Sequence, residues 1–172
     1  MIVLLDIDGV MVHANPHRPI ELDTDGFYKF NAVAVQILQS TIYFTKDQIV
    51  LSSSHRFKYS VVEWKKIFIR RGLNFRFLSI LDFSRRQAKV QDAVDLHDRI
   101  SRRTEIFEWI TLNKVSEQDV IIIDDDKSLN GLPENLKKRL VLTNPYTGLN
   151  NSVDLKKILG KEYFFDCQSF FE

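Results

Sequence analysis

Two carboxylates, Asp6 and Asp8, directly follow a short apolar run, IVLL at residues 2–5, with only one isoleucine between them. In an extended strand, residues two apart point to the same face, so these two charges lie side by side at the end of a buried element. Burying two like charges costs free energy unless a positive group compensates them. The pair therefore raises the question of which positive group lies between the two carboxylates.

A second acidic cluster follows another apolar run. In VIIIDDD, residues 120–126, Asp124 and Asp125 come directly after the apolar residues. Sites in parallel sheets form at the carboxyl ends of strands, so both clusters meet if the two strands are neighbours. Carboxylate oxygens are ligands that Mg²⁺ prefers, and Mg²⁺ often binds together with a phosphate. Strand ends also carry Asp as turn formers or helix caps, but two clusters on two buried strands favour the metal site.

The elements that must position these carboxylates follow from the hydrophobic pattern. Short apolar runs alternate with amphipathic segments, which predicts a parallel sheet flanked by helices. The expected strands are residues 2–5, 48–52, 75–80, 120–123 and 139–143. The expected helices are residues 30–42, 59–71, 102–112 and 151–160. We therefore expect an α/β fold, a Rossmann-like three-layer sandwich with a central parallel sheet.

Composition limits the class of protein. The 172 residues suit a single domain, residues 1–172, with its own core. The 24 Lys and Arg residues nearly balance 23 Asp and Glu residues, so the chain is not an overwhelmingly basic nucleic-acid binder. The single cysteine, Cys167, forms no internal disulfide, and no apolar stretch approaches the roughly 18 residues of a membrane span. We expect a soluble, cytoplasmic protein without a membrane partner; its oligomeric state stays open.

The acidic motifs, in their order, resemble the haloacid dehalogenase (HAD) superfamily. DIDGV at residues 6–10 resembles its first motif, and QIVLS at residues 48–52 resembles the second, an apolar strand that ends in Ser or Thr. VIIIDDD resembles the fourth. RRTEIFEWI and LVLTNPYTGLN resemble a branch of small phosphatase-like domains that includes parts of RNA-repair proteins. The resemblance implies a HAD-like fold and a Mg²⁺-dependent phosphohydrolase.

The resemblance also implies roles for the acidic residues. Asp6 is the nucleophile, which attacks a phosphoryl group to give an aspartyl-phosphate. Asp8 is the general acid and then the general base, and Gly9 lets the chain turn sharply beside the phosphate. The Asp6 carboxylate, the backbone carbonyl of Asp8 and Asp124 hold Mg²⁺, with Asp125 as a second or water-mediated contact.

The second motif continues as LSSSHR. Ser52 is expected to donate a hydrogen bond to a phosphoryl oxygen, with Ser53 in that role if the strand runs one residue longer. Ser54 is expected to cap the following helix. Arg56 is placed either to meet an anionic substrate or an acidic side chain, or to lie on the surface as an ordinary arginine.

The third motif of this superfamily is a basic residue, usually Lys, which stabilises the charge on the transferred phosphoryl group. Its usual place is the start of the helix before the acidic strand, where this chain has two arginines and no lysine. Arg102 is the first candidate, Arg103 the second and Lys89 the third.

Members of the superfamily select substrates with inserted caps. Residues from about 11 to 28, rich in turn formers, predict a small flap, and residues from about 85 to 101 predict a charged excursion. Neither gap holds a full cap domain, so we expect an open site. The aromatic tail, residues 161–172, is expected to cover an apolar patch of the same domain.

The predicted function is therefore a Mg²⁺-dependent phosphomonoesterase. Its substrate is a phosphorylated small molecule, a nucleotide or a nucleic-acid end. The basic and aromatic segment at residues 57–77 either meets a phosphate backbone or forms a helix and strand with solvated charges, and the second interpretation is favoured. The alternative function is a non-catalytic HAD-like binding or interaction domain. A phosphomutase, the third possibility, needs a larger cap to exclude water.

Overall fold

The computed structural model describes residues 1–82 and 101–160. The charged excursion, from residue 85 to residue 100 and including Lys89, lies outside these ranges, as does the aromatic tail. Among the helices in these ranges, none combines the length and the apolar character needed to cross a bilayer.

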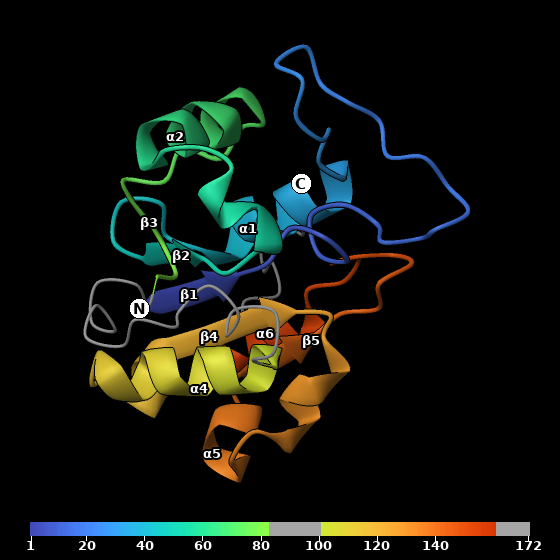
Figure 1. Cartoon of the computed structure of the whole chain (residues 1–172). Helices are drawn as coiled ribbons and strands as arrows, with labels where there is room; N and C mark the ends of the chain where they lie inside the picture. Colours follow the sequence, from blue (N-terminus) through green and yellow to red (C-terminus); the bar gives the residue numbers. More distant parts are fainter. Residues whose placement is uncertain (83–100, 161–172) are drawn as a thin grey trace, which may run out of the picture.

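Five parallel strands form one sheet in the order β3-β2-β1-β4-β5 (Figure 1). Their bounds are Ile2–Leu5 for β1, Gln48–Leu51 for β2, Phe77–Ile80 for β3, Val120–Asp124 for β4 and Leu140–Leu142 for β5. The predicted Rossmann-like α/β fold is confirmed. Because β1 lies between β2 and β4, the residues after β1 adjoin the carboxyl ends of both neighbours.

The helices of the described ranges are α1 (Ala32–Thr41), α2 (Val61–Arg70), α4 (Arg102–Leu112), α5 (Glu134–Lys137) and α6 (Val153–Ile158). α4 has the predicted bounds, whereas α1 and α2 begin two residues later than predicted. Asn31 and Ser60 are their N-caps, with side chains that accept hydrogen bonds from backbone N–H groups of the first turn. The short helices and 3₁₀ turns were not predicted, because a single turn is too short to show a helical period in the sequence. They are α5 and the 3₁₀ turns Ser54–Phe57 (η1), Glu117–Asp119 (η2) and Lys127–Gly131 (η3).

Apolar side chains cover both faces of the sheet and make three layers. Val3 and Leu5 of β1 pack in a core with residues of α1, α2 and α6, whereas Leu4 packs in a second core with residues of α4 and α5. This alternation is the two-residue period of a strand. Figure 1 shows α1 and α2 on one side of the sheet and α4 and α5 on the other. The central strands are thus buried on both faces, as their continuous apolar runs predicted.

The flap predicted at residues 11–28 is anchored to α2. Arg71, which directly follows α2, is buried and donates hydrogen bonds to the backbone carbonyls of Phe27 and Tyr28. The same guanidinium donates to both carboxylate oxygens of Asp25 at 2.7 and 2.9 Å, and this bonding lowers the pKa of Asp25 to about 2. One charge of the basic and aromatic segment is therefore an internal anchor of the flap.

Candidate active site

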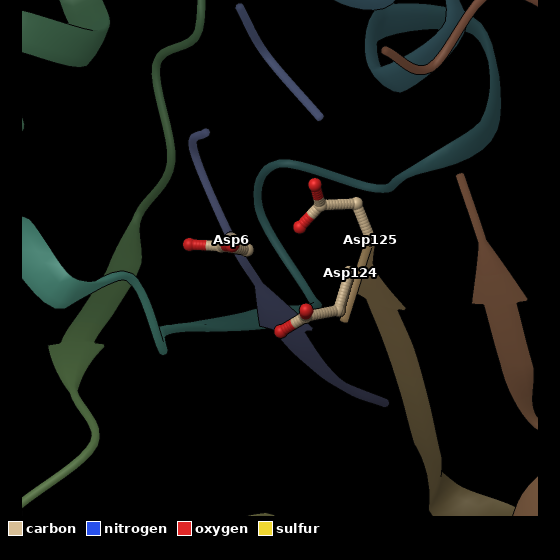
Figure 2. Close-up of side chains that lie close together, drawn as sticks. All are labelled: Asp6, Asp124 and Asp125. Carbon is tan, nitrogen blue, oxygen red and sulfur yellow. The ribbon is translucent and has the colours of Figure 1, made fainter. Parts of the chain in front are cut away.

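Three carboxylates gather where β1 and β4 end. The backbone N–H of Asp6 donates to the carbonyl of Ile123 at 3.0 Å, which continues the pairing of the two strands one residue beyond β1. Asp124 ends β4, and both aspartates are buried, at 4% and 0% exposure. One oxygen each from Asp6, Asp124 and Asp125 lies within 4.8 Å of the other two (Figure 2). The parallel sheet thus brings together the two acidic clusters that the sequence separates by more than a hundred residues.

The turn after Asp6 requires glycine at position 9. Gly9 has a φ of +67°, a backbone conformation that residues with a Cβ rarely adopt. A Cβ added there would lie 2.0 Å from Oδ2 and 2.8 Å from Cβ of Asp125. The Thr143 hydroxyl, just after β5, donates to the Gly9 carbonyl at 2.6 Å. The backbone therefore passes against Asp125, one of the three clustered carboxylates.

The charges in this cluster are poorly compensated. Burial raises the pKa of Asp6 to about 6, against the opposing effect of Arg102. Burial and then the neighbouring Asp6 raise the pKa of Asp124 to about 7, and burial also raises the pKa of Asp125. Among the described residues, Oδ1 of Asp6 and Oδ2 of Asp124 are buried without a hydrogen-bond donor. Buried oxygens in this state are stabilised by a bound cation.

The donor set fits a divalent cation with hard character. Carboxylate oxygens are the ligands that Mg²⁺ selects, and oxygens of three carboxylates converge here. Two of these carboxylates each have a buried oxygen with no hydrogen-bond partner among the described residues. The cluster of Asp6, Asp124 and Asp125 can therefore bind such a cation. The carboxylate of Asp8 is not part of it, and instead lies 2.9 Å from Nε2 of His55.

Arg102 is the basic residue that the fold directs into the cluster. It is the first residue of α4, whose N-cap is Ser101. Its Nη2 lies 3.7 Å from Oδ1 of Asp6, and its Nε lies 3.4 Å from Oδ2 of Asp124. Arg103 is exposed and lies elsewhere, with Nη1 3.5 Å from the carbonyl of Gly131. Of the two arginines proposed for the third motif, only Arg102 therefore contacts the carboxylates.

A family model with the description "HAD domain in Swiss Army Knife RNA repair proteins" matches residues 2–153. The chain belongs to this family. No curated protein matches it. At the level of the superfamily, the HAD domain is that of a phosphatase-type phosphohydrolase, and its buried aspartate cluster lies where the resemblance of the first and fourth motifs placed it.

The second motif of the HAD domain brings two serines to the same edge of the sheet. Ser52 donates its backbone N–H to the Leu5 carbonyl at 2.9 Å, and its buried hydroxyl has no hydrogen-bond partner among the described residues. Ser53 is also buried, and its hydroxyl accepts a hydrogen bond from the backbone of His55. Ser53 is thus the cap of η1, whereas the sequence predicted that role for Ser54, which is exposed. Among the serines of this motif in the described chain, Ser52 is the one whose buried hydroxyl has no hydrogen-bond partner, so it can donate to a ligand.

Arg56 is buried in the HAD domain, and its guanidinium bonds to groups of the protein itself. Its guanidinium donates to the carbonyls of Leu81 at 2.7 Å and Ser53 at 3.0 Å, and it forms an ion pair with Glu105. Burial lowers its pKa, against the opposing effect of Glu105. Of the possibilities raised from the sequence, the structure thus places an acidic side chain beside Arg56.

Two residues of this site were not predicted as members. Glu105 binds Arg56 on one side and accepts a hydrogen bond from Nη1 of Arg102 at 2.9 Å on the other, so it holds both guanidinium groups. Its spacing of three residues from Arg102 on a helix is a signal for such a pair. His55, which contacts Asp8, has no comparable signal, because its partner lies on another element.

In the absence of a divalent cation, the free energy of unfolding is expected to fall as the pH rises from about 4 to about 7. The carboxyl pKa values of about 6 and about 7 at Asp6 and Asp124 exceed the value of about 4 in an unfolded chain. The folded protein therefore binds more protons in this range, so raising the pH removes stability. Chemical denaturation in EDTA at several pH values measures this slope, and stability that rises with pH would contradict it.

Added Mg²⁺ is expected to reverse that loss at neutral pH, because a cation binds ionised carboxylates. The stabilisation is about 2.7 kcal/mol when the free cation is at 100 times its Kd. The variant Asp124→Asn should lose this response. Asp119→Asn should keep it, since Asp119 is exposed and precedes the opposite end of β4. If Mg²⁺ does not change the unfolding midpoint of the wild-type protein at any pH, the cation site is excluded.

Proposed function

We propose that the HAD domain is a Mg²⁺-dependent phosphomonoesterase that acts through an aspartyl-phosphate on Asp6. The observation that carries the proposal is that the guanidinium of Arg102 lies against the buried carboxylates of both Asp6 and Asp124. Arg102 also donates to the backbone carbonyl of Ser52, whose buried hydroxyl has no hydrogen-bond partner among the described residues. The nucleophile Asp6 thus lies beside a second carboxylate, Asp124, with which it can bind a cation. It also lies beside Arg102, which can bind a phosphate.

In the first step, an oxygen of Asp6 attacks phosphorus and the bond from phosphorus to the leaving oxygen breaks. Asp8 gives its proton to that leaving oxygen. Ser52 donates a hydrogen bond to a phosphoryl oxygen, and Arg102 stabilises the charge that gathers on the phosphoryl group. Glu105 keeps the Arg102 side chain in place through their 2.9 Å hydrogen bond.

In the second step, water attacks the phosphorus of the aspartyl-phosphate while Asp8 takes a proton from that water. The bond between phosphorus and Asp6 breaks, inorganic phosphate leaves, and Asp8 is protonated for the next cycle. Asp6, Asp124, Asp125 and the backbone carbonyl of Asp8 would hold Mg²⁺, which supplies positive charge that reduces repulsion between the anionic nucleophile and the anionic substrate.

The substrate class is a phosphorylated small molecule, a nucleotide or a nucleic-acid end. The family description names RNA-repair proteins, which supports testing nucleic-acid ends. Between β1 and β2 the described chain holds only the flap and α1, which supports an open site able to admit a large substrate. The alternative, a non-catalytic binding domain, is less favoured because the nucleophile and the acid are both present. The single-domain organisation and the cytoplasmic location stay predictions.

Hydrolysis of p-nitrophenyl phosphate with Mg²⁺ and with EDTA tests the proposal. We expect metal-dependent release, and then turnover of nucleotides or of oligonucleotides with a 3′- or 5′-phosphate. Release of phosphate from one end only would assign the substrate. No release by the wild-type protein from any of these compounds, under any divalent cation, would favour the binding domain.

The variant Ser52→Ala is expected to lower kcat/KM by about 100-fold, the usual cost of a lost hydrogen-bond donor to a charged transition state. Its free energy of unfolding should be equal or slightly higher, because the buried hydroxyl that is removed has no partner in the described chain. Steady-state kinetics and urea denaturation measure the two effects. The matched control is Ser54→Ala, an exposed serine two residues away, which should change neither. Equal kinetics for the two variants would remove Ser52 from the site.

A further inference from the structure

The general acid of the proposed reaction, Asp8, has one side-chain partner within residues 1–82 and 101–160. Its Oδ2 lies 2.9 Å from Nε2 of His55, and no other hydrogen bond or ion pair to this carboxylate is found among the described residues. A carboxylate only accepts hydrogen bonds, so the imidazole donates from Nε2. Both side chains are partly accessible, at 25% for His55 and 31% for Asp8, as expected for groups beside an entering substrate.

The backbone of His55 and its imidazole ring each have contacts that do not include Asp8. On its own element, η1, the backbone N–H of His55 donates to the hydroxyl of Ser53. On the flap, Phe27 and Tyr28 meet the ring at nearly right angles, with centroid distances of 5.9 and 5.3 Å. These two flap residues are themselves bonded through their carbonyls to the buried Arg71. The position of Nε2 is therefore set by the fold before Asp8 is considered.

We propose that His55 is a positioning residue for Asp8, which rests on the proposed phosphatase function. The Nε2–H of His55 donates a hydrogen bond to Oδ2 of Asp8, so Oδ1 of Asp8 is the oxygen that carries the proton. During the first step that proton moves from Oδ1 to the leaving oxygen as its bond to phosphorus breaks, and during the second step a proton of the attacking water returns to Oδ1. His55 neither gains nor loses a proton in the cycle. It restricts the rotation of the carboxyl group, which is the contribution of orientation to catalysis.

This role has a signature that a purely structural role lacks. p-Nitrophenolate leaves without needing a proton, whereas the alkoxide of glycerol phosphate must be protonated as it leaves. Because kcat/KM covers the steps up to the aspartyl-phosphate, the two substrates report whether proton donation is impaired. We expect His55→Ala to lower kcat/KM about 10- to 100-fold on glycerol phosphate, part of the range for general acid catalysis, and less than about threefold on p-nitrophenyl phosphate.

Two variants control this comparison. His55→Gln keeps an N–H donor on a side chain of similar reach, and it should recover most of the lost rate on glycerol phosphate. His17→Ala removes an exposed histidine of the flap and should match the wild type on both substrates. Circular dichroism and thermal unfolding verify that each variant is folded.

The outcomes separate this inference from the function on which it rests. If the wild type hydrolyses both substrates but His55→Ala loses the same factor on each, or loses none, the positioning role is wrong while the phosphatase stands. A wild type that hydrolyses neither of these substrates, nor the nucleotides and phosphorylated oligonucleotides above, under any divalent cation overturns both. Independently of turnover, ¹⁵N NMR should find His55 protonated at Nε2 and that N–H should exchange faster in Asp8→Ala. A ring protonated only at Nδ1 would also overturn the proposal.

Discussion

Replacing Asp6 with asparagine is expected to lower kcat/KM for phosphate monoesters by about 10⁴-fold or more, which is typical of the loss of a catalytic nucleophile. The amide has nearly the shape of the carboxyl group but does not attack phosphorus. The wild-type protein, quenched with acid during turnover, should carry a covalent phosphate that is acid-stable, and Asp6→Asn should carry none. Rapid quenching with labelled substrate, followed by peptide mapping, measures this difference.

The same variant is expected to remain folded in EDTA, with a free energy of unfolding at neutral pH equal to or above that of the wild type. Oδ1 of Asp6 is buried and has no hydrogen-bond partner in the described part of the chain, and the pKa of the neighbouring Asp124 carboxyl is raised by burial and then by Asp6. Removing this charge relieves that repulsion, while Arg102 keeps Asp124 and Glu105 as partners. Asp119→Asn, on the exposed η2, is the control for the loss of one carboxylate. Residual activity above about one percent of wild type would place the nucleophile elsewhere.

The second large effect is expected for Gly9→Ala, which should lose both stability and activity. A positive φ costs a residue with a Cβ about 1–2 kcal/mol, and overpacking against Asp125 adds about 1–3 kcal/mol. Rotating the Asp125 side chain does not relieve the clash, since its Cβ lies only 2.8 Å from the added atom. The backbone of the turn or of β4 must therefore move, and with it one of the three clustered carboxylates.

Gly26→Ala is a closely matched control for this prediction. Gly26 lies in the flap with a φ of +79°, but a Cβ added there meets nothing within 4 Å. The free energy of unfolding of Gly26→Ala should fall by about 1–2 kcal/mol, the cost of the positive φ alone. This variant should keep the wild-type kcat/KM and the wild-type response to Mg²⁺. Urea denaturation, kinetics and the Mg²⁺-induced shift in Tm compare the pair. Equal losses of activity in both variants would show that the contact with Asp125 has no part in the site.

Much of the fold was predictable because its signals are local. The continuous apolar runs of β1 and β4 indicate strands buried on both faces, and each run ends in carboxylates. The apolar face of α4 gave the bounds of that helix correctly, and the structure shows Ser101 as its N-cap. The position of short elements such as α5 was not predictable, because four residues do not complete a second helical turn.

Tertiary structure decided which of the candidate side chains face one another. Arg102 and Arg103 are neighbours in sequence and alike in chemistry, yet they point about 100° apart around α4, so packing of this helix on the sheet sends only one to Asp6. Arg56 and His55 follow the same strand, but one is directed inward to Glu105 and the other toward Asp8. The sequence by itself determined the strands, their parallel arrangement and the carboxylates that end two of them, since these depend on local hydrophobic pattern and on motif order. Which strands are neighbours in the sheet came from the structure. The partners of those carboxylates depend on side-chain directions at elements far apart in the chain, which only the packed structure sets.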